Sequence, residues 1–249
     1  LATSVPEALQ ELAECGLHPA PVSWCPEAFQ LPATERKTLV HCAAVTEGRI
    51  YVQSLSSLLP ILLLDPQPGE TILDLAAAPG GKTLHIAARM KNQGQVSAVE
   101  VIRGRYYLLR ENLRRGQARI VRTYLTDGRS VGRKTPQRFD RVLLDAPCSS
   151  EGRFRLDQPD TWQYWSLRKI REQARKQQGL LRAAMQAVRP GGTIVYCTCS
   201  FAPEENEMVV DSQWRRFLGE FTIQEISLPI ELVLPALTHW RGKELTREL

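Results

Sequence analysis

The sequence predicts an α/β fold in which a mostly parallel sheet is covered by helices on both faces, preceded by a small N-terminal α+β unit. From residue 71 onward, apolar runs typical of buried strands alternate with amphipathic helical stretches, which is the pattern of βαβ units. A chain of 249 residues can bury one large core and a small additional unit. Its 43% apolar and 24% charged content is that of an ordinary globular protein. No apolar run reaches the length of a membrane span, so we expect no membrane partner.

The individual elements follow from local composition. The predicted strands are residues 71–76, 95–101, 119–125, 138–145, 192–199 and 221–227. Helical periodicity predicts helices over residues 82–90, 103–115, 170–188 and 204–217. Gly116 and Pro190-Gly191-Gly192 are residues that typically end helices. Only one more strand is plausible after residue 227, so we expect the sheet to lack a closing strand.

The N-terminal segment differs in character from the rest. A short helical pattern covers residues 6–15, and a loop-rich run with four prolines follows it. We predict an N-terminal unit over residues 1–38 and a larger domain over residues 39–249. The chain begins Leu1-Ala2-Thr3, without an initiator Met or a signal-type apolar segment, and we interpret it as a fragment.

Basic residues are in excess and are clustered. The net charge is +5. The clusters lie at residues 103–122, 129–138 and 168–176. Such clusters suit a polyanionic partner, and they are equally typical of solvated helix faces.

The six cysteines have no CxxC pair and no zinc-binding spacing with the four histidines. We therefore predict no metal. Free thiols in a reducing compartment are the expectation, which indicates a cytoplasmic protein. Cys15, Cys25 and Cys42 are expected to be small packing residues without a functional role.

A run of small residues connects the first predicted strand to the helix that follows it. Small side chains let the backbone approach a ligand closely, and a helix N-terminus favours an anion. The loop consists of Ala76, Ala77, Ala78, Pro79, Gly80, Gly81 and Lys82. It differs from a nucleotide-binding P-loop only in its first residue, which keeps an NTPase open as an alternative.

Three details favour another ligand. Pro79 removes an amide donor from the loop. Asp74 precedes it where a cationic group would fit, and Glu100 ends the next strand, where dinucleotide-type folds hold ribose hydroxyls. A ligand with a ribose, a sulfonium and an amino-acid tail fits best, namely S-adenosylmethionine. Asp127 follows the third strand and could accept a hydrogen bond from adenine, although an Asp-Gly turn has an equally good structural explanation.

Two further strands end in cysteines. One segment is Asp145-Ala146-Pro147-Cys148-Ser149 and the other is Thr198-Cys199-Ser200. Carbon 5 of a pyrimidine becomes nucleophilic when a thiolate adds to carbon 6, so this pair suits methyl transfer to that carbon. Positive charge would favour the thiolate, and Lys82 is a candidate source. Asp145 would act as the acid toward the ring nitrogen, whereas Cys197 is expected to pack in the core.

At these residues the chain resembles the Sun-domain (Nop/Sun) family of RNA cytosine-5 methyltransferases. The resemblance covers about residues 21–210 and rests on the loop, on the two cysteine motifs and on Glu204-Glu205-Asn206-Glu207. Arg105, Asn112 and Arg115-Gly116 also fall in the family's pattern.

The resemblance implies a class I, Rossmann-like methyltransferase fold and a role for each motif. Cys199 would be the nucleophile, Cys148 would assist product release, and Asp145 would contact the cytosine and line the cofactor site. The residues implied to bind S-adenosylmethionine are the loop 76–82, Glu100, Arg105, Asp127 and Asp145. DNA cytosine-5 methyltransferases use the cysteine of a Pro-Cys motif as their nucleophile, so Cys148 is the alternative to Cys199 for this role.

The implied partner is structured RNA, with the basic clusters contacting phosphates, and we expect a monomer. Trp24-Cys25-Pro26-Glu27-Ala28-Phe29 is similar to bacterial ribosomal members, which favours ribosomal over transfer RNA. A non-catalytic RNA-binding assembly factor is the second alternative. Ser150 departs from the glycine common at its position. Trp162, Tyr164 and Trp165 are expected to pack in the core rather than to stack on bases.

Overall fold

The computed structural model describes residues 4–227, 230 and 234–246. The chain divides into two compact units, one of residues 1–71 and 77–125 and the other of residues 72–76 and 126–249. The predicted boundary after residue 38 is not tested by this division and stays a prediction.

The first unit begins with a capped helix and a short hairpin. Helix α1 (Val5–Glu14) starts with a capping box, in which Ser4 and Glu7 each accept a hydrogen bond from the other's backbone amide. Strands β1 (Ala20–Val22) and β2 (Cys25–Gln30) pair antiparallel. The sequence predicted only a loop here, because prolines in a segment argue against a strand. The strands of a two-stranded sheet tolerate proline, since they need few ladder hydrogen bonds.

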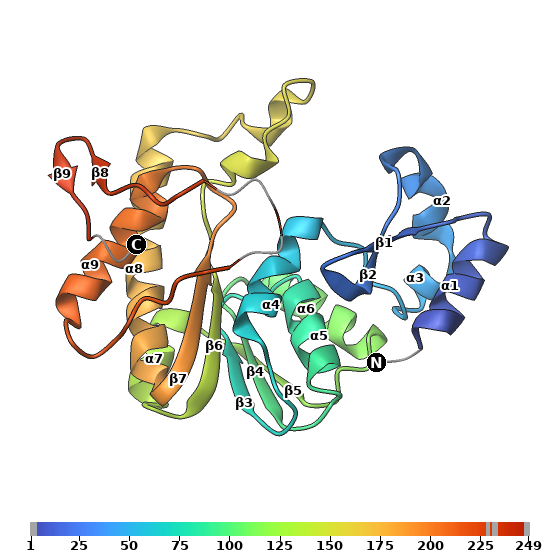
Figure 1. Ribbon diagram of the computed structural model, residues 1–249, viewed down its shortest axis with the longest axis horizontal. Coiled ribbons are helices and arrows are strands. Elements are labelled where there is room, and N and C mark those ends of the chain that lie inside the picture. Colours follow the sequence, from blue (N-terminus) through green and yellow to red (C-terminus); the bar gives the residue numbers. More distant parts are fainter. Residues whose placement is uncertain (1–3, 228–229, 231–233, 247–249) are drawn as a thin grey trace. The chain divides into compact units, whose positions relative to one another are not determined.

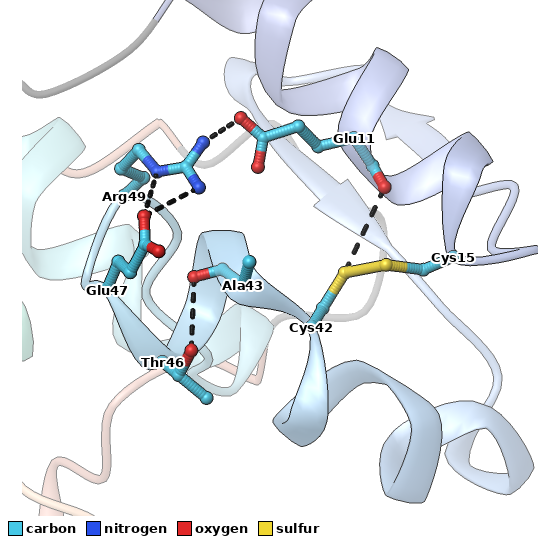
Figure 2. Close-up of a disulfide and its surroundings, with 7 residues drawn as sticks. All are labelled: Glu11, Cys15, Cys42, Ala43, Thr46, Glu47 and Arg49. Carbon is cyan, nitrogen blue, oxygen red and sulfur yellow. Dashed lines mark hydrogen bonds and ion pairs between the residues drawn. A yellow bond between two sulfur atoms is a disulfide. The ribbon is translucent and has the colours of Figure 1, made fainter.

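Cys15 and Cys42 form a disulfide, so the prediction of free thiols is wrong for this pair (Figure 2). Cys15 follows α1, and Cys42 lies between the short helices α2 (Arg36–His41) and α3 (Ala43–Thr46). Leu12, Leu17 and Leu39 pack around it. Twenty-seven residues separate the two cysteines, and such a separation gives no pairing signal in sequence.

The rest of the first unit consists of helices and two parallel strands. Its elements are α4 (Leu59–Leu64), α5 (Gly81–Arg89), β4 (Gln95–Glu100), α6 (Arg103–Arg115) and β5 (Val121–Leu125). Strands β4 and β5 are parallel, and both α5 and α6 pack on β4. A core cluster joins Leu84, Leu109 and Leu113 to the small residues Ala77 and Ala78 of the loop.

The second unit contains three parallel strands and the longest helix. Its elements are β3 (Thr71–Asp74), α7 (Val131–Lys134), β6 (Phe139–Asp145), α8 (Leu167–Ala187), β7 (Val188–Cys197) and α9 (Glu207–Arg216). Helix α8 packs on β6 and β7 and contacts α7 and α9 (Figure 1). The five long strands form one sheet in the order β5-β4-β3-β6-β7, which confirms the predicted α/β class. None of the described helices combines the length and hydropathy that crossing a bilayer requires.

Two strand predictions need correction. Residues 221–227 alternate apolar and polar side chains but form no strand, because they have no partner among the described residues; Ile226 is exposed. After residue 234, where one further strand at most was expected, β8 (His239–Trp240) and β9 (Lys243–Glu244) make a separate antiparallel pair. Strand β7 ends at Cys197, so Cys199 lies in a bend beyond the strand end.

Candidate active site

Two cysteines meet beyond the carboxyl ends of β6 and β7. The Sγ atoms of Cys148 and Cys199 lie 3.2 Å apart, which is hydrogen-bond contact and too long for a disulfide. Both side chains are half-buried. The sequence predicted this pair, and the structure brings its members together.

Strand register explains the meeting. Asp145 and Cys197 are partners in the parallel pair β6–β7, and the amide of Ala146 donates to the carbonyl of Cys197 at 2.9 Å. Each chain then continues for two or three residues before its cysteine. The amide of Gly152 donates to the carbonyl of Cys199 at 2.8 Å, so the loop after Cys148 fixes the bend that carries Cys199.

The two thiols differ in acidity. A hydrogen bond from the Cys148 side chain lowers the pKa of Cys199 to about 6, and a hydrogen bond from Ser150 and the positive charge of Arg153 act in the same direction. The contact with Cys199, together with burial, raises the pKa of Cys148. At neutral pH, Cys199 is therefore the thiolate and Cys148 the thiol that donates to it. Lys82 was the expected source of positive charge. In the structure, the positive charge that lowers the pKa of Cys199 is that of Arg153.

A buried carboxylate holds the two cysteine loops together. Glu205, in the 3-10 turn Pro203–Glu205, is completely buried. Its carboxylate accepts hydrogen bonds from the amide of Ser149 at 3.0 Å and from the hydroxyl of Ser200 at 3.1 Å. Gln177 of α8 donates to Glu205 at 2.8 Å and to the carbonyl of Pro147 at 2.9 Å. One carboxylate thus connects the residues that follow each cysteine.

A second acidic residue supports the bend from outside. Glu151 accepts from the hydroxyl of Ser200 at 3.0 Å, from the amide of Phe201 at 2.9 Å and from the indole of Trp165 at 2.8 Å. Asn206 donates to the carbonyl of Ser200 and accepts from the hydroxyl of Thr198 at 2.7 Å. The sequence reasoning assigned no role to Glu151, Arg153 or Gln177. Glu205 and Asn206 were noticed only as part of a family motif.

Asp145 and Cys197 lie side by side at the strand ends. The thiol of Cys197 donates to Asp145 Oδ1 at 3.6 Å. The charge of Asp145 opposes ionisation of Cys199. Asp145 is therefore close enough to the cysteine pair to act on a group bound there.

The aromatic residues of the segment before α8 are exposed, contrary to the expectation that they pack in the core. Tyr164 is 81% exposed, and Trp162 and Trp165 are also exposed. Trp165 makes an edge contact with Phe154 at 6.5 Å between ring centroids. The Trp165 ring contacts Glu151, so an exposed aromatic residue adjoins the cysteine bend.

A group that the sequence did not reveal lies in the first unit. Ligand-type atoms of Cys25, Glu27 and His85 all lie within 4.8 Å of one another. His85 Nε2 and Arg89 both contact the same oxygen of Glu27, at 3.0 and 2.9 Å. Hydrogen bonding by His85 lowers the pKa of Glu27 to about 2. We interpret the group as an ion-pair cluster that ties β2 to α5, because a guanidinium already occupies the carboxylate.

Comparison with known proteins decides the family. The model of the family described as "16S rRNA methyltransferase RsmB/F" matches residues 61–223. The chain is 42% identical over 214 residues to Ribosomal RNA small subunit methyltransferase F of Escherichia coli, covering 84% of this chain and 44% of that protein. The chain belongs to the RsmB/F family of methyltransferases. It spans less than half the length of the curated relatives that it matches.

Solved structures agree with this membership in the RsmB/F family. A methyltransferase homologue from Pyrococcus horikoshii is 34% identical, with a TM-score of 0.79 over 99% of this chain and 75% of that one. NSun6 from the same organism, solved with the cofactor analogue SFG, is 35% identical, with a TM-score of 0.66 over 77% of this chain and 47% of that one. RsmB/F proteins are S-adenosylmethionine-dependent methyltransferases with a class I fold, so the family favours this cofactor over ATP in the loop.

The residues of the loop fit the cofactor of the RsmB/F family. Gly80 precedes α5 with φ +113°, and no side chain caps the N-terminus of the helix, which is the kind of helix end that favours a carboxylate. A Cβ on Gly80 would lie 3.0 Å from Leu109 Cδ1, and one on Gly81 would lie 2.6 Å from the Tyr51 ring. Packing against Leu109 and Tyr51 therefore requires glycine at both positions.

Arg105 and Asn112 of α6 hold this loop from outside. Arg105 donates to the carbonyl of Ala78 at 2.5 Å, and Asn112 donates to the carbonyl of Pro79 at 2.8 Å. Arg105 also lies 3.6 Å from Glu100, whose buried carboxylate accepts from the amide of Ile102 at 2.7 Å. Arg105 thus positions the loop and Glu100 together.

Asp127 has a structural partner. Its carboxylate caps the turn Gly128–Ser130 by accepting from the amide of Arg129 at 2.9 Å, and it pairs with the Arg129 guanidinium at 2.6 Å. That hydrogen bonding lowers the pKa of Asp127. The structural role is present, and a contact with adenine stays a prediction.

Proposed function

We propose that this protein transfers a methyl group from S-adenosylmethionine to carbon 5 of a cytosine in 16S ribosomal RNA through a covalent adduct on Cys199. The observation that supports this most is the asymmetric cysteine pair, in which a thiol of lowered pKa contacts a second thiol at 3.2 Å. The asymmetry favours Cys199 over Cys148 as the nucleophile, because only Cys199 is ionised near neutral pH.

The first step is addition of the Cys199 thiolate to carbon 6 of the cytosine. The ring nitrogen gains electron density as the carbon–sulfur bond forms, and Asp145, in its protonated form, would donate a hydrogen bond or the proton to it. Carbon 5 of this adduct has enamine character. Bound S-adenosylmethionine would supply the methyl group to carbon 5, its sulfonium–methyl bond would break, and it would leave as S-adenosylhomocysteine. The target base must leave its stack to reach Cys199.

The second step releases the product. The proton on carbon 5 must depart to a base so that its electron pair restores the ring double bond and expels Cys199 as a thiolate. We assign Cys148 to this step, because its sulfur touches that of Cys199. Once Cys199 is bonded to carbon 6, the thiolate that raised the pKa of Cys148 is gone, so Cys148 would release its own proton to solvent and, as a thiolate, accept the proton of carbon 5. Cys197, which donates to Asp145, is not required as a reacting group.

The cofactor would be held by three groups of residues. The amides of the loop 76–82 would bind its carboxylate, Glu100 its ribose hydroxyls, and Asp127 and Asp145 the remaining polar groups. Arg105 would act through the loop and Glu100, which it contacts.

Ribosomal RNA is the proposed substrate because the matching family and the curated relatives are described by that activity. We place the enzyme in the cytoplasm for the same reason.

The test uses Cys148→Ser with RNA from cells that lack this methylation. Incubation with S-adenosylmethionine should accumulate an RNA–protein band on a denaturing gel, because addition proceeds while release is blocked. Sequencing the trapped RNA would identify the cytosine.

Two controls make this test decisive. The band should vanish when Cys199→Ala is combined with Cys148→Ser, and Cys197→Ser should behave like the parent protein. A band that survives without Cys199 would move the nucleophile to another residue. Binding of S-adenosylmethionine without any methylation in the parent would contradict the proposed reaction.

A further inference from the structure

Helix α8 carries an unusual concentration of positive charge. It has six basic residues and one acidic residue, a net charge of +5 that equals the net charge of the whole chain. The remaining residues are therefore balanced, and the basic character of this protein is concentrated on one element.

Four arginines of α8 share one face. Arg168, Arg171, Arg175 and Arg182 follow one another at intervals of three, four and seven residues, and these are spacings that return to the same side of a helix. The row spans about 21 Å at the rise of an α-helix. Arg182 is half-buried and the other three are exposed.

Two hollows lie along this row. One, of about 440 Å³, is lined by Arg168, Arg171 and Arg175 together with Glu172. The other, of about 560 Å³, is formed where α8 meets α7 and α9. Arg133, Arg182 and Arg216 line it, together with the ion pair of Asp127 and Arg129. We call these six arginines the α8 arginine surface.

The arginines of this surface keep their charge available. Among the described residues, none of the six forms an ion pair with a carboxylate; Arg182 donates only to the amide oxygen of Gln213, at 3.4 Å. The basic cluster of α6 differs, because Arg114 and Arg115 both pair with Glu111. Uncompensated guanidinium groups in a row suit a regularly spaced polyanion.

The opposite face of α8 supports the catalytic loops. Gln177 is buried and donates to Pro147 and Glu205, which position the two cysteine segments. One helix about 10 Å thick therefore carries the cysteine loops on one side and the arginine surface on the other.

We propose that the α8 arginine surface binds the phosphate backbone of the substrate RNA at a site separate from the pocket of the target base. This inference rests on the proposed RNA substrate. Guanidinium groups bind phosphate through paired hydrogen bonds and release counterions, so this contact adds affinity without reading sequence. It would hold the RNA against the helix that supports the nucleophile.

The experiment compares two variants of equal charge. The first combines Arg171→Gln, Arg175→Gln and Arg182→Gln. The matched control combines Lys91→Gln, Arg241→Gln and Lys243→Gln, which are exposed basic residues outside the three basic clusters. The probe is an in-vitro transcript of 16S ribosomal RNA, and Kd is measured by filter binding from about 50 to 400 mM salt, a range over which phosphate contacts weaken steeply.

The first variant should bind at least about tenfold more weakly at about 150 mM salt, and its plot of log Kd against log salt should lose about two to three units of slope. The control should stay within about threefold of the parent. A second variant, with Arg133→Gln, Arg168→Gln and Arg216→Gln, repeats the measurement if the first does not fold. Equal losses in the control, or a parent that does not bind the transcript, would overturn the inference.

Methylation is read separately, with labelled S-adenosylmethionine. The first variant should keep kcat at saturating RNA and should raise KM. A parent that binds the transcript through this surface but does not methylate it would refute the proposed function and leave the inference standing. Loss of binding to phosphatidylserine vesicles with unchanged RNA affinity would point to a membrane surface instead and overturn the inference.

Discussion

Two sulfur atoms at 3.2 Å set the chemistry of this site at the scale of single residues. A thiol that donates to a neighbouring sulfur stabilises the neighbour's thiolate and resists its own ionisation. The pair therefore separates into a nucleophile and a proton-holding partner without a histidine. The positive charge of Arg153 also stabilises the Cys199 thiolate.

The lowered pKa of Cys199 predicts a defined pH dependence. Cys199 should be a thiolate above about pH 6 and should lose reactivity as the pH falls through that value. Alkylation by iodoacetamide, followed residue by residue with mass spectrometry, should give a midpoint near pH 6 for Cys199. Arg153→Gln should move this midpoint upward.

Cys25 provides an internal control, because burial raises its pKa to about 11 and it should stay unmodified in the folded protein. A midpoint for Cys199 near that of an ordinary thiol would contradict the assignment of the nucleophile.

Ser150 stands at a position where glycine is common, and the structure shows two effects of this difference. It lies in the left-handed region, at φ +64°, where a side chain is strained. Its hydroxyl also helps to lower the pKa of Cys199. The residue therefore combines backbone strain with a favourable effect on the nucleophile.

Ser150→Gly should raise the stability of the folded protein, and it should also raise the pKa of Cys199. The gain in free energy of unfolding should stay below about 1 kcal/mol, because the flexibility of glycine in the unfolded chain offsets part of the relief. Ser150→Ala should raise the pKa equally without adding stability. Urea unfolding and the alkylation midpoint measure the two effects, and an Ala variant as stable as the Gly variant would refute the strain.

At the scale of elements, the site depends on how the ends of β6 and β7 are joined. Neither cysteine lies within its strand, and the bends that carry them have few backbone hydrogen bonds of their own. Glu205 supplies the connection by accepting from Ser149, Ser200 and Gln177. The 3-10 turn before α9 is therefore part of the active site, although it contributes no reacting group.

Glu205→Gln should destabilise the fold and disorder the cysteine pair. The NH2 group of the new glutamine would face the buried N–H and O–H groups that now donate to the carboxylate. The expected loss in free energy of unfolding is about 2 to 3 kcal/mol. Glu172→Gln is the matched control, because Glu172 is exposed and pairs only with Lys176; its effect should stay within about 0.5 kcal/mol. Urea unfolding measures both variants. Similar losses in free energy of unfolding would contradict the role of Glu205 in joining the two cysteine loops.

Element types were predictable where the signal is local. Helix α6 coincides with the predicted residues 103–115, because its periodicity lies within the segment and Gly116 follows it directly. Residues 221–227 show the limit: their alternation expresses strand propensity, and a strand also needs a partner. Likewise, the exposure of Tyr164 is a property of where its segment lies, which no local pattern contains.

At the scale of the whole molecule, the chain has two compact units with different means of stabilisation. The second unit relies on packing of α8 against β6 and β7. The N-terminal part of the first has only short strands and helices around a small apolar cluster, and the disulfide Cys15–Cys42 crosses it (Figure 2). A small core of this kind gains most from a covalent link.

Removal of this disulfide should lower stability measurably. The combined change Cys15→Ser and Cys42→Ser should cost about 3 kcal/mol, as expected for a closed loop of this size. The parent treated with dithiothreitol should show the same fall in Tm, whereas the variant should not respond. A parent insensitive to the reductant would mean that the link does not contribute.

Sequence by itself determined the α/β class, the small-residue loop and the two cysteine motifs, and it indicated the proposed chemistry, because these depend on residue types at short spacings along the chain. Only the tertiary structure decided that Cys148 touches Cys199, that Glu205 joins their loops, that Cys15 is bonded to Cys42, and that the arginines of α8, α7 and α9 form one surface. These are contacts between residues far apart in sequence. Their energies arise from distance and burial, and strand register and helix packing set both.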